Sequence, residues 1–297
     1  MALRVTARST TDLVLRVLRE AREPLTVEEI LSRVQKLAPV HSANPKNTMR
    51  KAISQMFLVQ STRDGRYAYL PYLLADNHFR HPISREELLN RYFLLSPELV
   101  TALWPSTYEI AKRRSESPAY LRLAEQQEVE AMRTYREVEG WAMEAGEDFW
   151  GWLEGQTPHP GDELVFSVVD AEARRYALRF DRRDDRPEGE IAERNLELAN
   201  QAEGLLKAAH DAVILSSLAV RLIGLGVYQH PIPPDPLVTV LHNDPRFVDA
   251  GLDLVALADR WPGYPSEPVD YRRLSANVSP AARLAGTPEV EEVEEEL

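Results

Sequence analysis

The sequence predicts an α+β protein that is mainly helical. Apolar residues recur at helical spacing in most of the first 155 residues, alternate with polar residues between positions 156 and 189, and return to helical spacing from residue 190. The 297 residues are 44% apolar and 28% charged, which is enough for two or three hydrophobic cores. The chain contains no cysteine, which excludes disulfide scaffolds and thiolate metal sites.

The N-terminal part of the chain begins with two capped helical patterns. Apolar residues predict a first helix over residues 12–22, with Thr11 as its cap, and Pro24 ends it. Thr26 and Glu29 then have the spacing of a capping box, in which each side chain bonds to the other residue's backbone. A second helix is therefore expected to start after Thr26.

A third helical pattern and a hairpin complete this part of the chain. The third helix is predicted from residue 46 to residue 58. Asp64 and Gly65 favour a tight turn between two short strands at 58–60 and 66–70. Three helices followed by a small antiparallel hairpin are the elements of a winged helix, so this fold is predicted at the N-terminus.

Three sequence strings carry a family resemblance over about residues 10–74. The strings "VLREAREPLTVEEILSRV", "NPKNTMRKAISQ" and "RDGRYAYL" together resemble the HARE-type winged helix-turn-helix family. The resemblance implies a winged helix, and it implies DNA as a partner because DNA binding is proposed for many members, although some modules contact proteins. The residues at the places of the family pattern are Pro24, Leu25, Thr26, Glu29, Ile30, Pro45, Thr48, Ile53 and Tyr67.

Charge is distributed unevenly along the chain. The net charge is -12, yet residues 1–75 hold 12 Lys or Arg and only 6 Asp or Glu. The final residues, 287–297, contain six Glu and no basic residue. A basic segment in an acidic chain is expected when one domain contacts phosphates. The alternative is a chance fluctuation of surface charge.

The candidate DNA-binding residues lie on the third helix and the hairpin. A recognition helix needs donors for base edges and cations for phosphates, and one face of the third helix offers both. Two arginines of the hairpin are placed to reach the adjacent backbone. The alternative is a solvated helix face without a partner. The candidate residues are Lys46, Asn47, Arg50, Lys51, Ser54, Arg63 and Arg66.

The middle of the chain is predicted to be helical and then to form a small β element. A long helix is expected over residues 118–145, either packed on its own domain or paired with its copy in a dimer. Trp141, Trp150 and Trp152 have acidic neighbours, which favours a core or an interface over a base-stacking site. Residues 156–189 alternate as two strands.

The C-terminal part resembles a diverged second winged helix of the same family over about residues 190–260. In "LVTVLHNDPRFVDAGLDLVALADRW" a helix precedes two strands that flank a Gly turn. The expected recognition helix, 236–242, carries no Lys or Arg, and Arg246 has Asp244 and Asp249 close in sequence. Protein contact or dimerisation is therefore expected here. The acidic ending is either a disordered solubilising tail or an autoinhibitor that folds back on the basic domain.

The sequence contains no signature of an enzyme or of a cofactor site. Glycine-rich phosphate loops, a nucleophile elbow and the zinc-protease motif are absent, and no acid stands two residues before a lysine as certain nucleases require. His78 and His81 lack a third metal ligand in register. Catalytic residues, metals and cofactors are therefore not expected. The lack of a signal peptide, of a membrane span and of cysteine favours a cytoplasmic location.

These observations predict a DNA-binding protein, used in transcription regulation, that contacts the duplex through its N-terminal winged helix. The alternative is an assembly factor, associated with polymerase or a defence system, whose winged helices bind protein through residues 76–265. A homodimer is compatible with both. The expected domains are a winged helix, a helical region, a small β element, a second winged helix and an acidic tail, at residues 1–75, 76–155, 156–189, 190–265 and 266–297.

Overall fold

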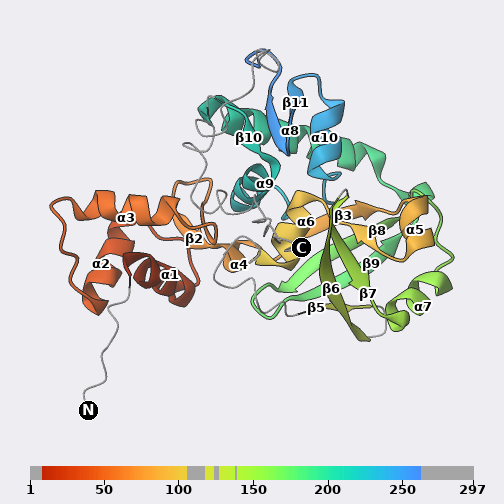
Figure 1. Ribbon diagram of the computed structural model, residues 1–297, viewed down its shortest axis with the longest axis horizontal. Helices are drawn as coiled ribbons and strands as arrows, with labels where there is room; N and C mark the ends of the chain where they lie inside the picture. The colour runs from red at the N-terminus through yellow and green to blue at the C-terminus, as the bar shows by residue number, and fades with distance from the viewer. Residues whose placement is uncertain (1–8, 106–117, 124–126, 138, 210, 262–297) are drawn as a thin grey trace, which may run out of the picture.

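The protein consists of an N-terminal helical unit, a central seven-stranded sheet and a C-terminal unit with a small sheet of its own (Figure 1). The computed structural model describes residues 9–105, 118–123, 127–137, 139–209 and 211–261. The N-terminal unit lies at one end of the molecule, and the C-terminal unit lies beside the central sheet. The mixture of helices and sheets agrees with the predicted α+β class.

The N-terminal unit contains three helices and a hairpin, in the predicted order. Its hairpin pairs β1 with β2 in antiparallel register. A core of apolar side chains from all three helices and β1 holds the unit together. The elements are α1 (Thr10–Ala21), α2 (Val27–Leu37), α3 (Pro45–Ser54), β1 (Val59–Ser61), β2 (Tyr67–Tyr69) and the short α4 (Leu70–Leu73).

The cap of the first helix and the end of the third helix differ from the prediction, and the other boundaries shift by at most two residues. Ser9, and not Thr11, caps α1, because the Ser9 hydroxyl accepts the Asp12 N–H while the Asp12 carboxylate accepts the Ser9 N–H. The third helix ends at Ser54 and not at residue 58. Leu58 instead joins the core shared by the central and C-terminal units. The capping box of Thr26 and Glu29 is confirmed.

The central sheet takes most of its strands from segments predicted to be helical. The strand order is β3-β8-β9-β5-β6-β7-β4, and every neighbouring pair is antiparallel except β5 with β9, which is parallel. The strands are β3 (His78–Pro82), β4 (Phe93–Leu94), β5 (Ala119–Arg122), β6 (Glu128–Arg136), β7 (Gly140–Ala145), β8 (Glu163–Asp170) and β9 (Arg175–Asp181).

The prediction of a long helix over residues 118–145 is wrong, because the described parts of this segment form β5, β6 and β7. Along β6, Val129 and Ala131 are buried while Glu128, Glu130 and Met132 are exposed, which is the period of two that a strand requires. The helical spacing of apolar residues in this segment was coincidental. Among the described residues between 76 and 155, the helices are short: α5 (Arg85–Asn90), α6 (Pro97–Leu103) and α7 (Glu147–Gly155).

Residues 156–189 are also not a separate β element. Strands β8 and β9 pair with each other as predicted, and they also pair with β3 and β5 in the centre of the large sheet. A lone hairpin is marginally stable, so the pairing of β8 with β3 and of β9 with β5 explains how the two strands are held.

The tryptophan cluster that precedes these strands contributes to the core, as predicted for Trp150. The Trp150 ring is buried and stacks on the Phe93 ring, with the ring centroids 5.1 Å apart.

The C-terminal unit has the predicted helix and two strands, with one more strand added. The additional strand β10 pairs with β12, so that the order in this sheet is β10-β12-β11. The β11–β12 turn passes through Leu252 and Asp253, both at positive φ. The elements are α8 (Glu188–Ala209), β10 (Val213–Ile214), α9 (Leu215–Gly224), α10 (Leu237–Asn243), β11 (Phe247–Gly251) and β12 (Leu254–Leu257).

The three units pack against one another without a free linker. Leu58, Leu70 and Leu74 of the N-terminal unit share a core with apolar residues of α9 and of the sheet. The His78 N–H in β3 donates to the Tyr228 carbonyl oxygen, at 2.7 Å, just after α9. None of the helices within the described ranges combines the length and apolarity needed to cross a bilayer. The acidic tail predicted at residues 266–297 lies outside the described residues.

Candidate nucleic-acid interface and central cleft

The exposed face of α3 brings together most of the predicted DNA-binding residues. Lys46, Asn47, Arg50 and Lys51 are all exposed on this helix, and Ser54 at its end is exposed as well. The helix starts at Pro45, and the Asn44 side chain caps it by accepting the Asn47 N–H at 3.1 Å. The Asn47 side chain therefore remains on the helix surface beside the first turn.

These residues differ in how far they are already engaged. The Lys46 ammonium lies 2.9 Å from the Glu28 carboxylate, and this contact lowers the pKa of Glu28. The Ser54 hydroxyl donates to the Lys51 carbonyl oxygen. Arg50 and Lys51 have no ion-pair partner within the part of the chain that the structure describes. Arg50 and Lys51 are therefore available to contact phosphates. A phosphate would have to displace the Glu28 carboxylate before it could contact Lys46.

The hairpin arginines are directed to acidic partners. Arg66 lies 3.1 Å from Asp64 in the same turn, where a hydrogen bond from the Thr62 hydroxyl lowers the pKa of Asp64. Arg63 lies 3.5 Å from Glu197 on α8. This ion pair joins the hairpin to the C-terminal unit, a contact that the sequence did not predict. Residues 9–75 carry ten Lys or Arg and six Asp or Glu, and much of this excess is paired.

The expected recognition helix of the C-terminal unit carries no cation in the structure either. The exposed side chain of α10 that is most apolar is Val238, which is 45% exposed. Arg246 is bound by Asp244 at 2.6 Å and by Glu203 at 2.7 Å. The second partner is Glu203 of α8 and not Asp249, whose carboxylate accepts the Gly251 N–H. This surface is consequently poorly suited to phosphates.

A buried ionic network joins the central sheet to the C-terminal unit. Arg80 on β3 and Arg186, which precedes α8, both contact the fully buried Glu163 on β8. Arg186 also lies 2.6 Å from Asp235, in the segment before α10. Burial and the nearby Arg186 charge lower the pKa of Arg80 to about 10, so that it stays charged at neutral pH. No sequence signal marks these residues as partners.

Glu98 forms a second buried polar link, between α6 and α10. Its Oε1 accepts the Leu237 N–H at 2.9 Å, which places a carboxyl group at the N-terminus of α10. Its Oε2 is buried without a hydrogen-bond partner in the described part of the chain, as is the Tyr228 hydroxyl. Burial raises the pKa of Glu98. The loss of hydration therefore disfavours the charged form of this carboxyl group relative to an exposed one.

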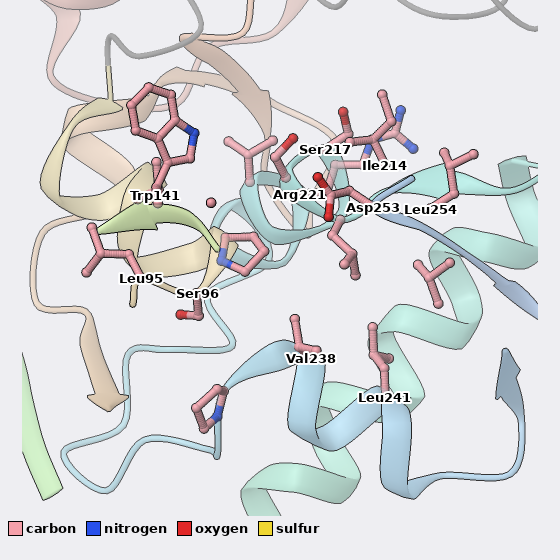
Figure 2. Close-up of a pocket in the computed structure, with 18 of the residues that line it drawn as sticks. Leu95, Ser96, Trp141, Ile214, Ser217, Arg221, Val238, Leu241, Asp253 and Leu254 are labelled. Atoms are coloured by element: carbon pink, nitrogen blue, oxygen red, sulfur yellow. The ribbon is translucent and has the colours of Figure 1, made fainter. Parts of the chain in front are cut away.

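A large cleft lies where the three units meet (Figure 2). Its volume is about 2020 Å³, above the range of roughly 300–1,000 Å³ typical of small-molecule pockets. Leu95, Ser96 and Trp141 lie on the side of the central sheet, and Val238 and Leu241 of α10 face them (Figure 2). Ser217 and Arg221 of α9, Asp253 of the β11–β12 turn, and Ile214 and Leu254 of the small sheet also line the cleft there.

The cleft is mostly apolar, and its charged lining is acidic on balance. Among the described lining residues there are four acids, Glu87, Glu139, Asp249 and Asp253, and two arginines, Arg133 and Arg221. The Arg133 guanidinium lies 4.2 Å from the centre of the Trp141 ring. The walls of this cleft come from segments far apart in the chain, so no local pattern of the sequence predicts it.

The two neighbouring histidines are directed to different partners. His78 and His81 lie on strand β3, where they contact different partners. His78 Nδ1 is 2.7 Å from the Ser167 hydroxyl, and His81 Nε2 is 3.0 Å from the Glu87 carboxylate. Within the described residues, no group of three or more histidines and acids is placed to hold a metal ion. Burial lowers the pKa of His78, which favours a neutral ring.

No family model matches this chain, and neither a curated protein nor a solved structure matches it.

Proposed function

We propose that this protein binds duplex DNA through α3 and acts as a transcription regulator. The observation that carries the proposal is the exposed face of α3, where Asn47 offers an amide for base edges and Arg50 with Lys51 offers cations for phosphates. The order of three helices and an antiparallel hairpin supports a winged helix for residues 9–75. In that fold the third helix enters the major groove.

The C-terminal unit has the elements of a second winged helix. Its elements follow in the order α8, β10, α9, α10, β11 and β12. The last two strands form an antiparallel hairpin, and the short strand β10 pairs with β12. Its third helix, α10, presents apolar surface and no Lys or Arg. We therefore propose that this unit contacts protein, and that only the N-terminal unit contacts DNA. This assignment favours a regulator with one DNA-binding surface per chain.

The expected number of phosphate contacts follows from the ion pairs. The charge count of the sequence suggests about six contacts, but Arg63 and Arg66 already contact acids, and Lys46 contacts Glu28. Two or three contacts remain for α3, from Arg50, Lys51 and, if Glu28 is displaced, Lys46. The logarithm of the binding constant should then fall with the logarithm of the salt concentration with a slope of about -2 to -3.

The test is a titration of labelled duplex DNA with the full chain at several salt concentrations, read by fluorescence anisotropy. Reversing both charges in Arg50→Glu/Lys51→Glu should lower the affinity at least about tenfold and reduce the salt slope by about 2. The matched control is Arg122→Glu, because Arg122 is an exposed arginine of β5 away from α3. An absence of binding by the unmodified chain at low salt would refute the proposal.

The alternative is an assembly factor that binds protein through both outer units. The apolar surface of α10 favours it for the C-terminal unit alone. The same charge-reversed variant separates the two functions, because Arg50 and Lys51 lie on α3 and not on α10. Loss of DNA binding with retained binding of a protein partner is the outcome expected here. Unchanged DNA affinity in that variant would instead favour the alternative.

A further inference from the structure

The central cleft exposes apolar side chains that its own walls do not cover. Leu252 in the β11–β12 turn is 78% exposed, Tyr135 of β6 is 60% exposed, and Val238 of α10 is 45% exposed. All three line the cleft, although they come from different units. Exposed apolar side chains gathered around one cleft are typical of a place where another group of atoms packs.

The size of the cleft indicates a polypeptide as the occupant. Its volume of about 2020 Å³ exceeds the roughly 300–1,000 Å³ of small-molecule sites. Its lining carries four acids and two arginines, so it is a poor place for the phosphates of a nucleic acid. An apolar segment with a slight excess of positive charge would match both its apolar surface and the excess of acids in its lining.

We propose that residues 262–286 of the same chain occupy this cleft. The described chain ends at Trp261, four residues after β12, and Leu254 and Val255 of that strand line the cleft. A segment of 25 residues can extend over roughly 80–90 Å, so reach is no obstacle. This proposal does not depend on DNA binding by α3.

The composition of residues 262–286 fits the cleft better than that of the residues after them. The segment contains three Arg and two acids, and its larger apolar side chains are Tyr264, Val269, Tyr271, Leu274, Val278 and Leu284. The following residues, 287–297, hold six Glu and no base. Because Asp249 and Asp253 lie in the cleft lining, the acidic run would be repelled from it while the arginines would be attracted.

Photo-crosslinking from a single introduced thiol tests the proposal on the full chain. The chain has no cysteine, so Val238→Cys can be labelled uniquely with a benzophenone maleimide. Illumination and peptide mapping should then join position 238 to residues 262–286 of the same molecule. The matched control is Leu196→Cys on α8, since Leu196 is 59% exposed and does not line the cleft. This control should not capture that segment.

Two results would overturn the proposal. One is capture of residues 262–286 from a second molecule, detected by mixing isotopically light and heavy chains, which would assign the cleft to another copy. The other is capture of residues 262–286 from neither Val238→Cys nor Leu252→Cys. The second variant protects the test if the first fails to fold, because Leu252 also lines the cleft but is largely exposed.

A measurement of thiol reactivity adds an independent readout. In the proposed arrangement the Val238→Cys thiol should react several-fold more slowly in the full chain than in a chain that ends after Trp261. The Leu196→Cys thiol should react equally fast in both chains. Equal reactivity at position 238 in both chains would contradict the occupation of the cleft.

Discussion

Gly224, the last residue of α9, allows the N-terminal hairpin to contact the C-terminal unit. A Cβ atom at this position would lie 2.6 Å from the Ser61 carbonyl oxygen and 3.4 Å from the Gln60 Cβ, both in β1. The oxygen belongs to the backbone, so the strand itself would have to move. Gly224→Ala should destabilise the protein by about 1–3 kcal/mol, the usual cost of overpacking.

A second glycine supplies the control for this substitution. Gly204 lies in α8, and a Cβ there would meet nothing within 4 Å. Because alanine favours a helix over glycine by roughly 0.8–1 kcal/mol, Gly204→Ala should stabilise the protein. Urea unfolding of the full chain, followed by circular dichroism, compares the two variants. If Gly224→Ala proved as stable as Gly204→Ala, the packing of β1 against α9 would be refuted.

Three further predictions concern charged groups. Burial raises the pKa of Glu98 in the folded protein above the ordinary value of 4.5. The contribution of Glu98 to the free energy of unfolding should therefore decline as pH rises above 4.5, and it should become constant once pH exceeds the pKa of Glu98 in the folded protein. The difference in thermal stability between Glu98→Gln and the unmodified chain should therefore depend on pH above about 4.5, with the variant gaining relative to the unmodified chain as pH rises, and a difference that is independent of pH would contradict the assignment. Glu163→Gln should cost about 3–5 kcal/mol because it leaves Arg80 buried without its carboxylate. The exposed pair of Glu20 provides the comparison, since Glu20→Gln should cost less than about 1 kcal/mol in the same denaturation assay. If the acidic run is an autoinhibitor, removing residues 287–297 should tighten DNA binding most at low salt, and equal affinity with and without it would leave only a solubilising role.

The N-terminal unit was predictable because its signals are local. The capping box of Thr26 and Glu29 joins residues three positions apart, and Asp64 with Gly65 forms the turn within four residues. The exposed candidates on α3 followed from the same helical periodicity. The ion pairs of Lys46 and Arg63 were not predictable, because the partner of Lys46 lies on α2 and the partner of Arg63 lies on α8.

The central sheet shows where local patterns are insufficient. Residues 118–145 contain apolar residues at spacings of three and four, and β6 also contains an alternation of Val129 and Ala131 with charged residues. The choice between helix and strand there depended on partners, since β6 is bonded to β5 and β7 on either side. A single segment of sequence does not reveal such partners.

The sequence by itself determined the capping box and the turn of the N-terminal unit and the helix that presents Asn47, Arg50 and Lys51. It also determined the charge difference between the basic N-terminal and the acidic C-terminal part of the chain. These features arise from contacts between residues within a few positions of one another. Only the tertiary structure decided the parallel pairing of β5 with β9, the burial of Glu163 between two arginines and the cleft between the units. These features depend on hydrogen bonds and desolvation between distant segments, whose free energy appears only when the chain has brought them together.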